Sequence, residues 1–349
     1  MTARKKVSQQ RIARDLKVSQ ALVSLALNGR KDGIHAETYQ RIWTHALSLG
    51  YEPKGMNLER SPTPARSQQI GFILRAGLSI HTQGSYFSHV LHGLHTELAE
   101  QGYAAVFLGT EDTLTAERLA HFFRPRHAPA GVVLFGEVSA AFLQALRAQT
   151  GNVVAVSARH PGFCHSVVGN EPQALQLLVQ HLWELGHRRI GWLGGNVGLG
   201  RHEARHAAFV SALEACGGRE DERYRVYLKQ ADRAEGAQAI EELLPLAKRK
   251  DFPTAFITYN TLMAAGAAMA WLREGGKIPG ECSIAAADNS RLAQVEKPRL
   301  TVAGTDPEKL GQAAARLLLD VIGRDDESLH DLILPSEFVA GESTGTAKR

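Results

Sequence analysis

The sequence predicts a small all-α domain followed by an α/β body of two subdomains with doubly wound parallel sheets. The chain has 349 residues, 44% of them apolar and 22% charged, which suits two or three globular domains. The first 66 residues hold 12 Lys or Arg against 5 Asp or Glu, whereas the rest hold 28 against 31. From Gln69 onward, short apolar runs alternate with helical patterns. A basic head on a nearly neutral body is typical of nucleic-acid-binding regulators.

Several protein classes are excluded by what the sequence lacks. No apolar run reaches the roughly 18 residues that a membrane span needs, and the basic N-terminus has no apolar signal-peptide region. The three cysteines, Cys164, Cys216 and Cys282, are far apart and form no CxxC pair. We therefore expect a cytoplasmic, nucleoid-associated protein that uses neither a metal nor another cofactor.

The basic head has the apolar periodicity of three short helices. Ser8 is the predicted cap of a helix over 9–16, and Ser19 caps a second over 20–28. A third helix is expected over about 36–49. Two short helices joined by a tight turn, with a third closing the core, form a helix-turn-helix domain.

The second helix of such a domain presents its exposed side chains to base edges in the major groove. Gln20 can pair with adenine through two hydrogen bonds, whereas Ala21 and Leu25 can make only apolar contacts, for instance with a thymine methyl. Ser24 lies on the same predicted face. The other candidate DNA contacts, mainly to phosphates, are Ser8, Lys17, Ser19, Asn28, Arg30 and Lys31.

The stretch IARDLKVSQALVSLALNG, followed by a helix that ends in LGYEP, resembles the head of the LacI/GalR family of bacterial transcription regulators. That family's pattern is VA-x2-AGVS-x2-TVSRVLNG, then LGYxPN. The chain has Leu16 and Lys17 in place of Ala-Gly, Leu22 in place of Thr, and Leu25 in place of an Arg that commonly reads a guanine. The resemblance implies sequence-specific DNA binding with a changed preference opposite Leu25.

Residues 54–68, KGMNLERSPTPARSQ, are predicted to be a hinge or linker because glycine and prolines interrupt them. In the family this segment is a hinge helix that inserts a leucine into the minor groove. Alignment from Tyr51, itself a candidate DNA contact, places the inserted position at Arg60, with Leu58 and Met56 nearby. A shifted insertion at Leu58, a minor-groove arginine and a plain flexible tether all remain open.

The body alternates buried strands with helices, as expected for parallel sheets covered on both faces. The predicted strands are 70–74, 103–108, 130–135, 153–157, 189–194, 225–228, 254–258 and 283–287. The predicted helices are 86–101, 114–123, 139–149, 172–186, 200–216, 235–247 and 260–273.

The body also resembles the LacI/GalR family, through GSYFSHVLHGL, the run from VVGNEPQ to HRRIGWLGG, RHAAFVSAL, AFITYNTLMAAGAAMAWL and IAAADNSRLAQVEKPRLTVAGTDPEKLG. The resemblance implies a periplasmic-binding-protein-like type I body whose chain crosses three times between two subdomains. The expected division is a DNA-binding domain at 1–53, a hinge at 54–68, an effector-binding and dimerisation domain at 69–342 and a tail at 343–349. Within the third part, the N-subdomain takes 69–165 and 295–323, and the C-subdomain takes 166–294 and 324–342.

Five effector contacts follow from the same resemblance: Tyr86, Phe87, Arg205, Asn260 and Asp288. Carboxylate, guanidinium and aromatic groups suit a polyol. However, three family carboxylate positions are altered, to Asn170-Glu171, Asn260-Thr261 and Ser157-Ala158. Fewer hydroxyl acceptors leave open a sugar, an unusual sugar, a nucleobase-like ring or no ligand.

An enzyme is the alternative. The string HEARH at 202–206 matches the HExxH zinc pattern, with Glu203 as base, although such a match arises readily by chance. The alternative interpretation is therefore a zinc-dependent hydrolase or a small-molecule-binding module with an accessory basic domain. We expect instead a homodimeric DNA-binding regulator, a repressor, that binds double-stranded operator DNA and a small effector such as a sugar.

Overall fold

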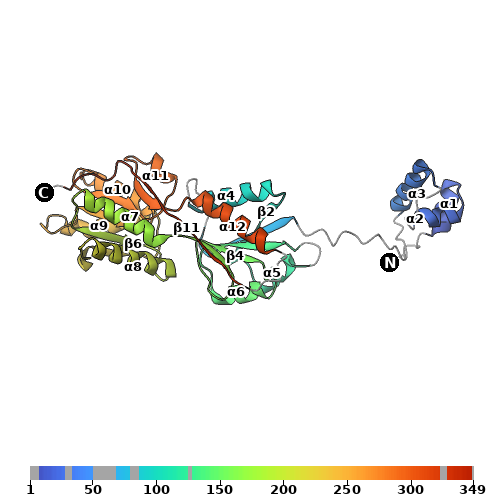
Figure 1. The fold of residues 1–349 in the computed structure, drawn as a ribbon, viewed down its shortest axis with the longest axis horizontal. Coiled ribbons are helices and arrows are strands. Elements are labelled where there is room, and N and C mark those ends of the chain that lie inside the picture. Colours follow the sequence, from blue (N-terminus) through green and yellow to red (C-terminus); the bar gives the residue numbers. More distant parts are fainter. Residues whose placement is uncertain are drawn as a thin grey trace. The chain divides into compact units, whose positions relative to one another are not determined.

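The computed structural model describes residues 8–27, 34–49, 68–78, 86–124, 128–322 and 328–347. The chain divides into two compact units, Met1–Arg66 and Ser67–Arg349. Figure 1 shows the first unit as a small cluster of helices and the second as two sheet-containing lobes. None of the described helices is long and apolar enough to span a membrane.

The first unit contains α1 (Gln9–Leu16), α2 (Gln20–Leu27) and α3 (Ala36–Ser48). As predicted, the hydroxyl oxygen of Ser8 accepts from the N–H of Arg11, and that of Ser19 accepts from the N–H of Leu22. These contacts satisfy backbone donors that a helix start otherwise leaves unpaired. The buried apolar side chains from all three helices are Ile12, Ala13, Val23, Ala26, Leu27, Ile42 and Ala46.

The turn between α1 and α2 depends on Lys17. This residue has φ 54° and ψ 42°, the left-handed conformation, and its N–H donates to the carbonyls of Ala13 and Arg14. Glycine adopts this conformation without the steric cost that a Cβ brings. Lys17 therefore has a small conformational free-energy cost at a position where the family pattern has glycine.

The second unit contains two six-stranded sheets. The first has the order β11-β5-β4-β3-β1-β2, and the second has the order β12-β10-β9-β8-β6-β7. All pairings are parallel except β10 with β12, which is antiparallel at the sheet edge. The strands are β1 (Gln69–Leu74), β2 (Ala104–Thr110), β3 (Gly131–Phe135), β4 (Val153–Val156), β5 (His165–Gly169), β6 (Ile190–Gly194), β7 (Arg225–Tyr227), β8 (Ala255–Thr258), β9 (Ser283–Ala286), β10 (Thr301–Gly304), β11 (Asp331–Leu334) and β12 (Glu337–Val339).

Helices cover both faces of the first sheet. Side chains of α4 (Tyr86–Glu100) and α12 (Pro307–Val321) pack in one apolar cluster, and those of α5 (Ala116–Phe122) and α6 (Ala140–Arg147) pack in another. A single large cluster holds the second sheet with its helices. The helices of that lobe are α7 (Glu171–Glu184), α8 (Gly200–Ala215), α9 (Arg233–Leu243), α10 (Thr261–Arg273) and α11 (Leu292–Val295), with short 3-10 turns at Glu222–Tyr224 and Leu244–Leu246.

The chain passes between the sheets three times: after β5, after β10 and after β11. These crossings lie later in the sequence than the expected boundaries. β10 belongs to the second sheet although 295–323 was assigned to the N-subdomain, and β11 belongs to the first although 324–342 was assigned to the C-subdomain. Apolar periodicity identifies strands, but it does not say which sheet edge a strand joins. The short strands β5, β10, β11 and β12 and the helices α11 and α12 were not assigned from the sequence at all.

Helices α4 and α12 approach closely because each has a glycine that faces the backbone of the other helix. A Cβ on Gly311 would lie 1.9 Å from the carbonyl oxygen of Val90, and one on Gly93 would lie 2.0 Å from that of Glu308. Such distances leave no room for even a methyl group. The helix pair positions Tyr86, at the start of α4, for the site described below.

We predict that Gly311→Ala lowers the free energy of unfolding by about 1–3 kcal/mol or more, because the methyl group forces two packed helices apart. Gly151→Ala is the matched control, because a Cβ there meets nothing within 4 Å. Urea unfolding of the full chain measures both. Equal stability of the two variants would contradict the close packing of α4 and α12.

Candidate functional site

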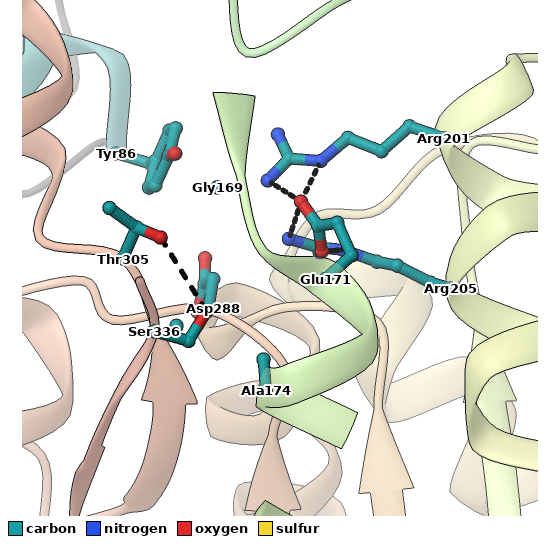
Figure 2. A pocket seen from close by; sticks show the side chains of 10 residues that line it. Tyr86, Gly169, Glu171, Ala174, Arg201, Arg205, Asp288, Thr305 and Ser336 are labelled. Atoms are coloured by element: carbon teal, nitrogen blue, oxygen red, sulfur yellow. Dashed lines mark hydrogen bonds and ion pairs between the residues drawn. The ribbon is translucent and has the colours of Figure 1, made fainter. Parts of the chain in front are cut away.

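A small cavity of about 10 Å³ lies where the carboxyl ends of strands from both sheets meet. Tyr86 starts the helix after β1, Asp288 follows β9, and Arg201 and Arg205 lie on the helix after β6. Parallel α/β sheets bind ligands at this edge. The lining residues are Tyr86, Gly169, Glu171, Ala174, Arg201, Arg205, Asp288, Gly304, Thr305 and Ser336 (Figure 2).

The centre of the site is an ion-pair network of three side chains. The Glu171 Oε1 atom lies 2.6 Å from Nη2 and 2.8 Å from Nε of Arg201. Its Oε2 atom lies 2.5 Å from Nε of Arg205, and Nη2 of Arg205 is 3.3 Å from Oε1. Arg205 is only 2% exposed and also donates to the carbonyl of Tyr259. One carboxylate thus binds both guanidinium groups, as Figure 2 shows.

The charges set the protonation of Glu171. Burial by itself would raise the pKa of the Glu171 carboxyl, but the adjacent guanidinium groups of Arg201 and Arg205 outweigh it, so that this pKa is lowered. Glu171 in turn raises the pKa of Arg201 against the effect of burial. The network is therefore fully ionised at neutral pH.

Asp288 is in the opposite situation. Burial raises the pKa of its carboxyl, and the charge of Arg205 and the hydrogen bonds from Thr261 offset this only in part. Its Oδ1 atom accepts from the N–H of Thr261 at 2.8 Å and from the hydroxyl of the same residue. These bonds fix the carboxyl at the cavity wall.

The three chain crossings are bonded to one another beside the cavity. The Ser336 hydroxyl donates to the carbonyl of Asn170 at 2.8 Å, and the N–H of Asn170 donates to the carbonyl of Leu334 at 2.9 Å. The Thr305 hydroxyl lies 3.1 Å from the carbonyl oxygen of Pro335. Asn170 also caps α7 by accepting from the N–H of Gln173. Hydrogen bonds therefore link the three crossing segments to the start of α7, the helix that carries Glu171.

Tyr86 forms the wall on the other lobe. Its hydroxyl lies 3.3 Å from that of Ser157, and the Arg201 guanidinium carbon is 5.5 Å from its ring centre. An arginine over an aromatic face at this distance is a cation–π contact. It joins the two lobes across the cavity.

Of the five effector contacts expected from sequence, Tyr86, Arg205 and Asp288 line this cavity. Phe87 and Asn260 are not among the lining residues. Phe87 packs against the rings of Tyr86 and Phe135 in the apolar cluster of the first lobe. Asn260 caps α10, accepting from the N–H of Met263 and donating to the carbonyl of Ala231, so its amide is occupied by the protein itself.

Four polar residues of the cavity were missed from sequence: Glu171, Arg201, Thr305 and Ser336. A signal was available for two of them. The altered pair Asn170-Glu171 and the second arginine four residues before Arg205 are both visible in the sequence. Their meeting depends on α7 and α8 packing side by side, which sequence spacing alone does not reveal.

The HEARH string does not form a metal site. His202 Nδ1 donates to the carbonyl of Gly195 at 2.8 Å, while His206 Nε2 lies 2.9 Å from a carboxylate oxygen of Glu220. Within the described ranges, no group of three or more His, Cys, Asp or Glu is arranged to bind a metal.

In the first unit, α2 buries one face and exposes the other. Gln20, Ala21 and Leu25 are exposed, Leu25 by 41%, and Ser24 is half-buried. Around the start of α2, Ser8, Lys17 and Ser19 are exposed as well. The other expected DNA contacts lie outside the described residues: Asn28, Arg30, Lys31, Tyr51, Met56, Leu58 and Arg60, together with nearly all of the 54–68 hinge.

Comparisons with known proteins agree with this architecture. Residues 179–344 match the model of the periplasmic binding protein-like domain. The HTH-type transcriptional repressor PurR of Aliivibrio salmonicida is 23% identical, over 89% of this chain and 91% of that protein. The transcriptional regulator CelR–cellobiose complex has a TM-score of 0.70 at 22% identity, covering 97% of this chain and all of that one. The lac repressor dimer bound to operator has a TM-score of 0.68 at 19% identity, covering 98% and 100%.

A helix-turn-helix head and a two-lobed, periplasmic-binding-protein-like body in one chain define a ligand-responsive DNA-binding regulator. The similarity to PurR over most of the chain, together with the shared fold, supports a LacI-family transcription regulator. The relatives are transcriptional repressors and not enzymes, which speaks against the hydrolase alternative, and both histidines of HEARH are hydrogen-bonded within the protein.

We predict that Asp288→Asn stabilises the protein at neutral pH, and that the gain shrinks as the pH falls toward 4. Burial raises the pKa of Asp288 in the folded state above its pKa in the unfolded state, so the protonated carboxyl favours folding. This contribution is complete below the unfolded pKa and is lost as the pH rises through the folded pKa. Asparagine keeps an acceptor for Thr261 but does not titrate. Melting temperatures from pH 4 to 8 measure this, with the exposed Asp112→Asn as control. A difference from the unsubstituted protein that does not change with pH would refute the assignment.

Proposed function

We propose that this protein is a transcriptional repressor that binds a roughly palindromic operator as a homodimer. Its affinity for the operator falls or rises when a small polar effector binds in the cavity. The exposed face of α2 carries the proposal. Gln20, Ala21 and Leu25 point away from the head's own core, at the start of a helix that a serine caps. That placement is what reading base edges in the major groove requires.

The contacts divide by chemistry into reading and positioning. Gln20 offers one donor and one acceptor to a base edge, and Leu25 offers an apolar surface. Lys17 supplies charge, and Ser8 and Ser19 supply hydroxyls, beside the helix start. Such groups bind phosphates and set affinity without selecting sequence.

Two heads are needed for a binding site long enough to be specific, and a twofold dimer matches a palindromic operator. The solved lac repressor is a dimer on its operator, which supports this arrangement here. The relative named PurR is a repressor, which supports the sign of the regulation.

The effector side rests on bonds that join the two lobes around the cavity. Glu137, after β3 of the first lobe, accepts from the N–H of Gly200 at 3.0 Å, at the otherwise uncapped start of α8. Arg291 of the second lobe pairs with Glu308 of α12 at 2.6 Å, and Lys309 pairs with Glu337. A ligand that fits one arrangement of the lobes better than another shifts the population toward it.

A sugar or a related polar metabolite suits the lining. The Tyr86 ring offers an apolar face, and Thr305, Ser336 and Asp288 offer oxygen atoms for hydroxyl groups. The similar regulator CelR was solved with cellobiose, which supports a carbohydrate-like ligand.

We predict that Gln20→Ala relaxes the preference at one operator base pair, at a cost of about 1–3 kcal/mol on the preferred sequence. Lys17→Asn should weaken all sequences alike and reduce the salt slope by about one, because it removes a phosphate contact. Asparagine is chosen because it tolerates the left-handed backbone of residue 17. The operator is first selected from random duplex DNA with the full chain, and binding is then titrated at several salt concentrations.

The two substitutions control each other. If both lowered affinity uniformly across sequences, the assignment of Gln20 to the groove would be incorrect. If the full chain selected no sequence at all, the proposed function itself would fail.

A further inference from the structure

Two arginines stand on the same face of α8, one turn apart; Arg205 is buried and Arg201 is partly buried. Arg201 and Arg205 are separated by four residues, so that their guanidinium groups are neighbours. Like charges at this spacing repel each other, and a buried guanidinium without a counterion is costly. Their side chains are 22% and 3% exposed. The pair therefore requires an anion between them.

Glu171 supplies that anion from inside the protein. Its two oxygens lie within hydrogen-bond distance of four guanidinium nitrogens, an arrangement in which arginines bind a free carboxylate or phosphate. Glu171 is in the first turn of α7, and the preceding residue, Asn170, is hydrogen-bonded to Ser336 in another crossing segment. From there the side chain can rotate away from α8 while its charge stays favourable at the helix start.

The cavity beside this network is small. Its volume of about 10 Å³ is far below the roughly 300–1,000 Å³ of typical ligand sites. A ligand of ordinary size must therefore displace a group that now fills the centre, and the Glu171 carboxylate is that group (Figure 2). A neutral ligand in its place would leave the two cations facing a single carboxyl, that of Asp288.

We propose, building on the proposed function, that the effector carries a carboxylate or phosphate group that replaces Glu171 between Arg201 and Arg205. Glu171 is then an internal competitor that keeps the arginine pair neutralised while the cavity holds no effector. The hydroxyls of Thr305 and Ser336 and the ring of Tyr86 receive the rest of the molecule. Sugar acids and sugar phosphates both have this chemistry.

The test compares the full-length protein with Glu171→Gln, which keeps the side-chain shape and removes the competing charge. Glu203→Gln is the matched control, because it removes one charge from an exposed position on α8, the helix that carries both arginines. Inorganic phosphate, glucuronate, glucose 6-phosphate and glucose are titrated at constant ionic strength, and binding is followed by calorimetry and melting temperature.

We expect inorganic phosphate to raise the melting temperature of Glu171→Gln more than that of the unsubstituted protein or Glu203→Gln. The affinity of Glu171→Gln for anionic sugars should be about tenfold or more above that of the unsubstituted protein. Glucose should bind all three proteins more weakly than its phosphate. Stronger binding of glucuronate identifies a sugar acid, and stronger binding of glucose 6-phosphate identifies a sugar phosphate.

Arg201→Gln gives the reverse test. It should weaken binding of the anionic sugars more than binding of glucose. If Glu171→Gln instead weakened every probe, Glu171 would be a direct acceptor of ligand hydroxyls, and the proposal would be overturned. Absence of any phosphate effect specific to Glu171→Gln would overturn it too.

Operator affinity, measured in the same samples, separates this inference from the proposed function. Anion binding that leaves DNA affinity unchanged would contradict regulation by the cavity, yet would leave the anion site standing. Normal operator binding without anion binding would contradict only the anion site.

Discussion

The pairing of one carboxylate with two guanidinium groups, one buried and one partly buried, governs the arrangement of the cavity. Arg201 and Arg205 can share a helix face only because Glu171 lies between them. Glu171 lies directly after the first crossing between the sheets, and the other two crossings are bonded to that point through Ser336 and Leu334. The ion pairs in the cavity and the segments that cross between the sheets are therefore only a few covalent bonds apart.

Most of the body could be predicted from sequence because buried parallel strands leave an unmistakable pattern. The predicted strands 70–74, 130–135 and 189–194 are nearly continuous apolar segments, and their bounds agree with the structure to within a residue. β10 was missed because Thr301 and Gly304 flank only two apolar residues. Its sheet membership also depends on pairing with β9, a contact made in three dimensions and absent from any local pattern.

The site was only partly predictable for the same reason. Asp288 and Arg205 were expected from the family resemblance, and both lie after strands of the second sheet, at the edge where such sheets bind ligands. Asn260 also follows a strand, but its amide is used to cap α10, a local demand that competes with ligand binding. Glu171 lacked any local signal beyond its difference from the family pair. Its role arises from two helices that pack against each other although 30 residues separate Glu171 from Arg201.

The bonds between the lobes suit a switch better than a rigid clamp. Arg291 and Lys309 have side chains that are 67% and 59% exposed, so that solvent and salt screen their ion pairs and each pair contributes little. The hydrogen bond between Glu137 and the start of α8 adds a charge-assisted contact of about 1.5–3 kcal/mol. Opening therefore costs a few kcal/mol, a range that a bound metabolite matches through differential affinity. The buried network of Glu171 lies at the pivot, where exchanging one anion for another changes that small balance without rebuilding either lobe.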